Sequence, residues 1–244
     1  MIQAFGISDV GCVRELNEDC FCLHGFTDGS DNGFCILADG MGGHNAGEVA
    51  SQCAVTLVAE KLKGVLENPN DAKIPAVLTE SVEEANRKIY NMSIETEQHR
   101  GMGTTIVLAF VLNKSVCIAN VGDSRAYVIN DNISQITCDH SIVEELVMSG
   151  TITRDEARVH PQRNVITRAV GTESVVKTDI FEYDAADGDT LILCSDGLSS
   201  MVTDEEIYNI TKNNESLKQT VCNLVETAKE RGGLDNITVI GIRF

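Results

Sequence analysis

Apolar residues follow a helical repeat in two long stretches of the chain. In residues 46–66, and again in 74–92, they return every three or four positions, which places them on one face of a helix. Shorter helical stretches are indicated at 142–148, 205–211 and 217–230. Each predicted helix therefore has one face to bury against another element.

Strands are predicted where short β-rich runs are bounded by Gly, Asp and Asn. These runs cover 2–10, 20–26, 34–38, 104–112, 115–121, 125–129, 133–136, 175–183, 190–194 and 236–243. The pair Asn113-Lys114 and the run 130–132 separate neighbouring strands as hairpin turns do. Such close turns favour antiparallel pairing over repeated βαβ units.

The order of these elements predicts the architecture. Strands, two helices, strands, two helices and a final strand follow one another along the chain. We expect an α+β fold, a central antiparallel β-sandwich of two sheets with helix pairs on both outer faces. No repeat or Gly/Pro/Ser-rich linker interrupts it, so residues 1–244 are expected to form a single domain. The polar stretch 139–169 is expected to be an inserted surface segment.

Charge and apolar content exclude several classes of protein. The chain has 244 residues, with 37 acidic against 19 basic side chains and a net charge of −18. Such a field repels nucleic acid and anionic membrane surfaces, so we expect neither as a partner. The longest apolar run, residues 106–112, has seven residues and is too short to span a bilayer. No basic segment followed by an apolar stretch opens the chain, so no signal peptide is expected.

Cysteine usage indicates a reducing compartment. The nine cysteines are an odd number, and no CxxC pair occurs among them. Several, such as Cys35 and Cys194, lie within apolar runs and are expected to be small buried side chains. We therefore expect a cytoplasmic protein with reduced thiols and no cysteine nucleophile.

Acidic residues recur at the ends of the predicted strands. They are Glu18 and Asp19 before 20–26, Asp39 after 34–38, Asp123 after 115–121, Asp196 after 190–194, and Asp235 before the last strand. Any one of them is explained as a turn residue, since Asp-Gly is a strong turn signal. Together they supply the carboxylate oxygens that hard divalent cations prefer, provided that the strand ends converge on one rim.

Seven short motifs carry a resemblance to a known family. They are RELNED (14–19), ADGMGGH (38–44), GMGTT (101–105), VGDSR (121–125), ITRAVG (166–171), SDGL (195–198) and DNIT (235–238). In this order, from about residue 5 to the C-terminus, they resemble the bacterial branch of the metal-dependent Ser/Thr protein phosphatases, the PPM or type 2C family. The family fold, a β-sandwich flanked by helix pairs, agrees with the predicted element order.

The resemblance implies a role for each acidic motif. Two Mn²⁺ or Mg²⁺ ions are implied, bridged by Asp39, with the Gly40 carbonyl on the first ion, and Asp196 and Asp235 on the second. Asp19 would hold metal-bound water, and Asp123 matches the position of a weaker third metal. Arg14 would bind the substrate phosphate, which suits its planar fork of donors.

The implied reaction is hydrolysis of phosphoserine and phosphothreonine in proteins. A hydroxide bridging the two ions would attack phosphorus in line, while the metals and Arg14 offset charge on the phosphoryl oxygens. The general acid stays open. Met41 follows the Asp-Gly pair and cannot donate a proton. His44 could replace it or could simply pack at the start of the helix 46–66.

The segment 139–169 resembles the family's flap beside the active site. His160, Arg163 and Arg168 give it positive charge, and two roles are open for them. They could contact the phosphopeptide, or they could form local ion pairs with acidic residues of the same segment, namely Glu144, Glu145, Asp155 and Glu156.

The partners follow from the resemblance alone. We expect phosphorylated proteins, including a Hanks-type Ser/Thr kinase and its substrates, and a monomeric enzyme. The alternatives are a catalytically weak relative that binds phosphoproteins or serves as a scaffold, and a plain acidic cation-binding protein. The second alternative would need neither Arg14 nor the ordered motifs, and no EF-hand loop is present.

Overall fold

The computed structural model of the chain describes residues 1–26, 30–42, 46–69 and 72–244. One sheet contains β1 (Gln3–Asp9), β7 (Arg125–Ile129), β8 (Ile133–Gln135), β10 (Thr190–Cys194) and β11 (Ile237–Arg243). The other contains β2 (Asp19–Gly25), β3 (Gly33–Met41), β4 (Gly103–Thr104), β5 (Ile106–Leu112), β6 (Ser115–Val121) and β9 (Asp179–Asp184). Their orders are β1-β11-β10-β7-β8 and β2-β3-β5-β6-β9, with β4 paired to β3.

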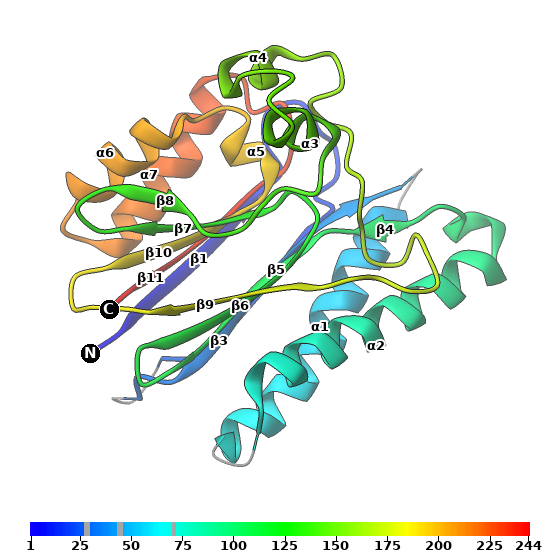
Figure 1. The fold of residues 1–244 in the computed structure, drawn as a ribbon, viewed down its shortest axis with the longest axis horizontal. Coiled ribbons are helices and arrows are strands. Elements are labelled where there is room, and N and C mark those ends of the chain that lie inside the picture. The colour runs from blue at the N-terminus through cyan, green and yellow to red at the C-terminus, as the bar shows by residue number, and fades with distance from the viewer. Residues whose placement is uncertain (27–29, 43–45, 70–71) are drawn as a thin grey trace.

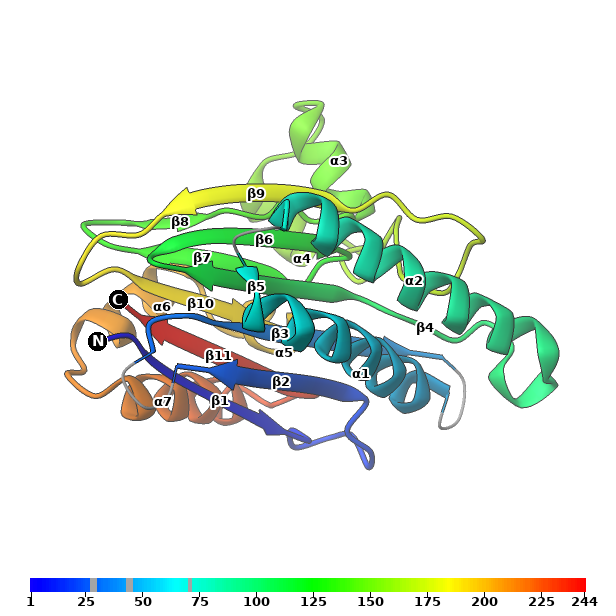
Figure 2. The same ribbon diagram turned by 90° about the horizontal axis from the view of Figure 1, so that it is seen from below.

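The two sheets lie face to face between two layers of helices (Figures 1 and 2). The outer face of the β3 sheet is covered by α1 (Ala46–Glu67) and α2 (Ile74–Glu95). The outer face of the β10 sheet is covered by α5 (Asp196–Ser199), α6 (Asp204–Lys212) and α7 (Leu217–Glu230). The expected α+β sandwich with helices on both outer faces is confirmed.

Successive side chains of a strand point to opposite faces of its sheet, and in both sheets the side chains on either face are apolar. On β3, Phe34 and Ile36 pack toward α1 and α2, whereas Cys35 and Leu37 pack between the sheets. On β10, Leu193 likewise faces the other sheet, while its neighbours face the helices. Strands buried on both faces appear in the sequence as continuous apolar runs rather than alternating ones.

The antiparallel registers bring the acidic strand ends to one edge. Asp19 and Asp39 are direct partners across β2 and β3. In the other sheet the last residue of β10, Cys194, pairs with the first residue of β7 and with Val239 of β11. The residues after β10 therefore lie beside those before β7 and β11. Convergence of the acidic residues follows from this register.

Several boundaries differ from the sequence predictions. The strand predicted at 175–183 begins only at Asp179, because its partner β6 ends near Asn120 and leaves residues 175–178 without a strand to pair with. The strand predicted at 34–38 continues to Met41, so Asp39 and Gly40 lie within β3 rather than in a turn. Asp196 opens the short helix α5.

The segment 139–169 contains α3 (Ile142–Met148) and α4 (Arg154–Val159), which stand together at one end of the sandwich in Figure 1. Its two ends are joined by a bridge between Ser141 and Ile166. The helix α4 was missed at the sequence level. A capping box formed by Thr153 and Glu156 starts it.

All nine cysteines are free thiols, and Cys35 and Cys194 are buried as expected, although Cys12 is exposed. In the described ranges, no helix has the length and apolar character needed to cross a membrane.

Candidate active site

Five aspartates from five separate strand ends meet at one end of the sandwich. Each of them influences the ionisation of at least one other, so their carboxyl groups lie within electrostatic reach. They are Asp19, Asp39, Asp123, Asp196 and Asp235. The sequence expectation that these residues converge agrees with this arrangement.

Asp19 is fixed through one of its two carboxylate oxygens. Its Oδ2 accepts hydrogen bonds from Ser195 Oγ at 2.8 Å and from Thr238 Oγ1 at 2.6 Å. Its Oδ1 is buried and has no hydrogen-bond partner among the described residues. Burial raises the pKa of Asp19 to about 7 despite the two hydroxyl donors. One oxygen is thus held rigidly, and the other is available to a ligand or water.

Asp39 occupies the centre of the cluster. Its backbone is fixed because its N–H donates to Thr105 Oγ1 at 3.1 Å and its carbonyl accepts from Thr105 N at 2.8 Å. Burial raises the pKa of Asp39 well above its ordinary value, and the charges of the other aspartates raise it further. The pKa of Asp196 is raised to about 6, mainly by burial and by Asp235, although a hydrogen bond with Asp39 lowers it.

Gly40 lies where the backbone of β3 approaches its neighbours most closely. Its N–H donates to Glu18 O at 3.1 Å. A Cβ at this position would lie 2.2 Å from Gly47 O and 2.6 Å from Glu18 O, so only glycine fits. Packing therefore restricts the residue after Asp39 to glycine.

Arg14 and Asp235 are joined across two loops at the edge of the cluster. Arg14 Nη2 donates to Asp235 Oδ2 at 2.8 Å, and the two side chains are 47% and 36% exposed. The next residue, Asn236, holds the first loop in place, because its Nδ2 donates to Leu16 O and its Oδ1 accepts from Glu18 N. Arg14 thus contacts the carboxylate cluster directly, through an ion pair that the sequence motifs did not predict.

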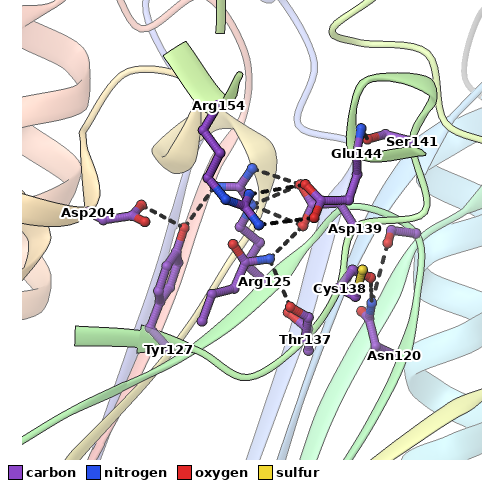
Figure 3. A network of polar contacts seen from close by, with 12 residues as sticks. Asn120, Arg125, Tyr127, Thr137, Cys138, Asp139, Ser141, Glu144, Arg154 and Asp204 are labelled. Carbon is purple, nitrogen blue, oxygen red and sulfur yellow. Dashed lines mark hydrogen bonds and ion pairs between the residues drawn. The ribbon is translucent and has the colours of Figure 1, made fainter. Parts of the chain in front are cut away.

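Beside Asp123, Arg125 forms a buried ion pair with Asp139, shown in Figure 3. Arg125 Nη2 lies 2.7 Å from Asp139 Oδ2, and its Nε contacts both carboxylate oxygens at 3.0 Å. Gln135 Nε2 donates to the same carboxylate, while Arg125 Nη1 donates to Tyr127 Oη. The pair therefore ties the start of the 139–169 segment to β7, two residues from Asp123.

His140 provides a second attachment of this segment. Its ring Nδ1 accepts a hydrogen bond from the backbone N–H of Gly122 at 2.9 Å. The backbone N–H of His140 donates in return to Gly122 O at 3.0 Å. Its Nε2 lies 3.1 Å from Asp179 Oδ2 and 2.8 Å from Arg168 Nη1. Burial, and to a smaller extent Arg168, lowers the pKa of His140 although the hydrogen bond with Asp179 raises it. A neutral ring with the proton on Nε2 fits the contacts with Gly122 and Asp179. Arg168 Nη1 can only donate, and its acceptor is then Asp179 Oδ1 at 3.0 Å rather than the ring.

A cavity of about 470 Å³ opens between the 139–169 segment and α5 and α6. Asp123 and Asp196 line one side of it, and Arg154, Arg158 and Arg163 line the other. The cavity thus connects the aspartate cluster with the basic face of the segment.

The basic residues singled out in the sequence have different surroundings. Arg163 and His160 form no ion pair within the described part of the chain, so the local pairs considered for them are not formed there. It is Arg154 that pairs with Glu144, at 3.1 Å. Arg168 pairs instead with Asp179 at 3.0 Å, outside the segment. Met41 ends β3, and His44 lies outside the described residues.

The donor set suits hard divalent cations. Several of the carboxylates are buried and have raised pKa values, and one of them has an oxygen without a partner among the described residues. Such a group of carboxylates binds protons or cations. Among the side chains described, no three His, Cys, Asp or Glu already enclose a common point. Asp235 is instead directed to Arg14, at 2.8 Å. The oxygen donors of these residues therefore suit such ions, although Arg14 competes with a cation for Asp235.

Ser195, Thr238, Asn236, Asp139 and His140 were missed by the sequence analysis. The first three lie within the motifs that supplied the aspartates, so their position next to a candidate ligand was a usable signal. Asp139 and His140 lie at the boundary of the inserted segment, and nothing local marks them as support for the site.

Comparison with known proteins identifies the family. The protein phosphatase 2C model matches residues 14–238. The serine/threonine phosphatase stp of Listeria welshimeri is 40% identical over 235 residues, which cover 96% of this chain and 92% of that protein. The serine/threonine phosphatase of S. agalactiae superimposes with a TM-score of 0.90 at 34% identity and covers 100% of this chain and 99% of its own.

A further solved structure adds the metal. The catalytic domain of the serine threonine protein phosphatase PstP, solved in complex with two manganese ions, has a TM-score of 0.83 at 34% identity and covers 99% of this chain and 97% of its own. The resemblance drawn from the seven motifs and the expectation of a protein phosphatase are confirmed, and this chain belongs to the protein phosphatase 2C family.

Proposed function

We propose that this chain hydrolyses phosphoserine and phosphothreonine in proteins and requires two divalent cations, Mn²⁺ or Mg²⁺. One observation carries the proposal. Aspartates from five strand ends converge beside an exposed arginine, in a fold whose relatives are named serine/threonine phosphatases. The manganese ions in the related PstP structure support two ions.

We assign the ligands as the resemblance implies. Asp39 and the Gly40 carbonyl, together with Asp196 and Asp235, would hold the two ions, and Asp123 would serve a weaker third. When bound, such ions lower the pKa of water toward neutrality and draw charge from phosphoryl oxygens.

The chain's own groups orient the reactants. Ser195 and Thr238 hold Asp19 Oδ2, which leaves Oδ1 to accept a proton from water at a fixed position. Arg14 uses Nη2 on Asp235 and keeps its other donors for phosphoryl oxygens. Because Asp235 cannot serve Arg14 and a cation equally well, ligation by Asp235 would release more of the Arg14 fork to substrate.

We further propose that residues 1–244 act as one domain and that 139–169 is a flap over the site. Arg163, which lines the cavity, and His160 of the same segment would contact the phosphopeptide. A Hanks-type Ser/Thr kinase and its targets are the proposed source of substrates. A monomer in the cytoplasm is the proposed form of the enzyme.

The test is phosphate release from a phosphothreonine peptide. Activity is expected with Mn²⁺ and not with EDTA, and Asp39→Asn should lower kcat by orders of magnitude because it removes the central carboxylate. Asp187→Asn is the matched control, since the Asp187 side chain is 87% exposed and Lys114 is its one ion-pair partner in the described ranges. Tight peptide binding without turnover in the Mn²⁺-loaded protein would instead indicate the phosphoprotein-binding alternative.

A further inference from the structure

Two loops run side by side next to Arg14. The loop between β1 and β2 and the turn before β11 are linked at three successive points. Cys12 N donates to Gly233 O at 2.8 Å, Arg14 pairs with Asp235 at 2.8 Å, and Asn236 Nδ2 donates to Leu16 O at 2.9 Å. Both loops proceed in the same direction through these links.

The links bring apolar residues onto neighbouring stretches of the two loops. Val13 lies between the first and second links on one loop, and Leu234 lies between the same two links on the other. Leu16 is at the third link. The side chains of Val13, Leu16 and Leu234 belong to residues that are 60%, 48% and 52% exposed. We call these three residues the apolar rim.

Single exposed apolar residues are common, but a group of them next to a polar site indicates binding. Nine large apolar residues are exposed in the described chain, and the three of the rim are on the two linked loops. The other side of the aspartate cluster is different, because the cavity there is lined by arginines and carboxylates. The site therefore has one apolar border and one charged border.

The rim is continuous with the proposed phosphate site. Val13 is adjacent to Arg14 in the chain, and Leu234 is adjacent to Asp235. Consecutive Cα atoms are about 3.8 Å apart, so a peptide whose phosphorylated residue contacts Arg14 carries its neighbours across the rim. An apolar neighbour would remove both its own surface and the rim's surface from water.

We propose that the apolar rim binds one apolar side chain close to the phosphorylated residue of the substrate, so that the enzyme prefers phosphosites flanked by Leu, Ile, Val, Met or Phe. This proposal rests on the proposed phosphatase function. It concerns KM more than kcat, because the contact is made equally in bound substrate and transition state.

The experiment is a phosphothreonine peptide series in which Leu replaces Ser at each position from about three residues before to three after the phosphosite. We expect one position at which Leu raises kcat/KM by about tenfold, mainly through KM, a value at the low end for an apolar pocket because the rim is half exposed. Leu234→Gln and Val13→Thr should remove this preference. Val175→Thr, at a 76% exposed residue outside the linked loops, is the matched control and should retain it.

p-Nitrophenyl phosphate, which has no flanking residue, distinguishes the outcomes. The rim variants should lose more activity toward the Leu peptide than toward this small substrate. Equal kcat/KM for Leu and Ser peptides at every position would overturn the rim proposal while leaving the phosphatase function intact. Hydrolysis of no phosphopeptide would overturn both. Concentration-dependent dimers of the wild type that Leu234→Gln abolishes would assign the rim to a second copy of the chain and overturn the proposal.

Discussion

Breaking the ion pair between Arg125 and Asp139 is expected to be strongly destabilising, because the pair is buried and the remaining partner would lack its counter-charge. The Asp139 side chain is 7% exposed and that of Arg125 is 22% exposed. Replacing Arg125 by Met leaves Asp139 with the Gln135 amide as its one polar side-chain partner within the part of the chain that the structure describes. Replacing Asp139 by Leu leaves Arg125 with only the Tyr127 hydroxyl among the described side chains. Either change leaves a charge in a site that water reaches poorly.

The magnitude follows from this burial. Removing one partner of a buried ion pair costs about 3–5 kcal/mol in the free energy of unfolding. For a chain of this length the loss corresponds to a decrease in Tm of about 6–20 °C. The double variant Arg125→Met, Asp139→Leu should lose much less than the sum of the single variants, because no unpaired charge remains.

Urea unfolding of the wild type, the two single variants and the double variant measures these changes in the free energy of unfolding. The matched control is Asp187→Ala, which removes a pair of the same 2.7 Å length between Lys114 and the exposed Asp187. That variant should unfold like the wild type. Single variants at Arg125 and Asp139 that are no less stable than this control, or a double variant with strictly additive losses, would refute the reasoning.

Three further predictions concern the site. Asp196→Asn should raise Tm in EDTA, because it neutralises a buried carboxylate that Asp235 repels. It should also reduce the Tm gain on adding Mn²⁺, whereas a lower Tm under both conditions would indicate a purely structural aspartate. Arg14→Ala should mainly raise KM for a phosphopeptide in steady-state kinetics, and calorimetry should show Mn²⁺ affinity unchanged or increased, since Asp235 loses its competing partner. His140 has a pKa lowered from 6.5, so the folded state resists its protonation and stability should fall as the pH drops below about 6.5. His140→Asn should show a smaller fall than the wild type in urea unfolding at about pH 7 and about pH 5.5; parallel pH profiles would contradict this.

Local pattern predicted most of the elements, because helices and buried strands must present apolar residues at fixed spacing. It was weakest where pairing decides the structure. Residues 175–178 continue the β-rich run of β9, but β6 offers them no partner, and Val175 is left 76% exposed. The short helix α5 begins at Asp196, although the Asp-Gly dipeptide there signals a turn. Packing against β10 and β11, rather than local propensity, fixes where this helix lies.

The sequence by itself indicated the family and the acidic residues that the structure brings together. The ordered motifs were sufficient to name the family. Their aspartates, at the ends of apolar strands, were the residues expected to converge. Tertiary structure decided how those residues are held. Only the packing of one sheet on the other places Ser195 and Thr238 on one oxygen of Asp19. The other oxygen is left without a partner among the described residues. Only the adjacency of two distant loops joins Cys12 to Gly233 and pairs Arg14 with Asp235. These contacts join residues more than 170 positions apart, and no local spacing in the chain records them.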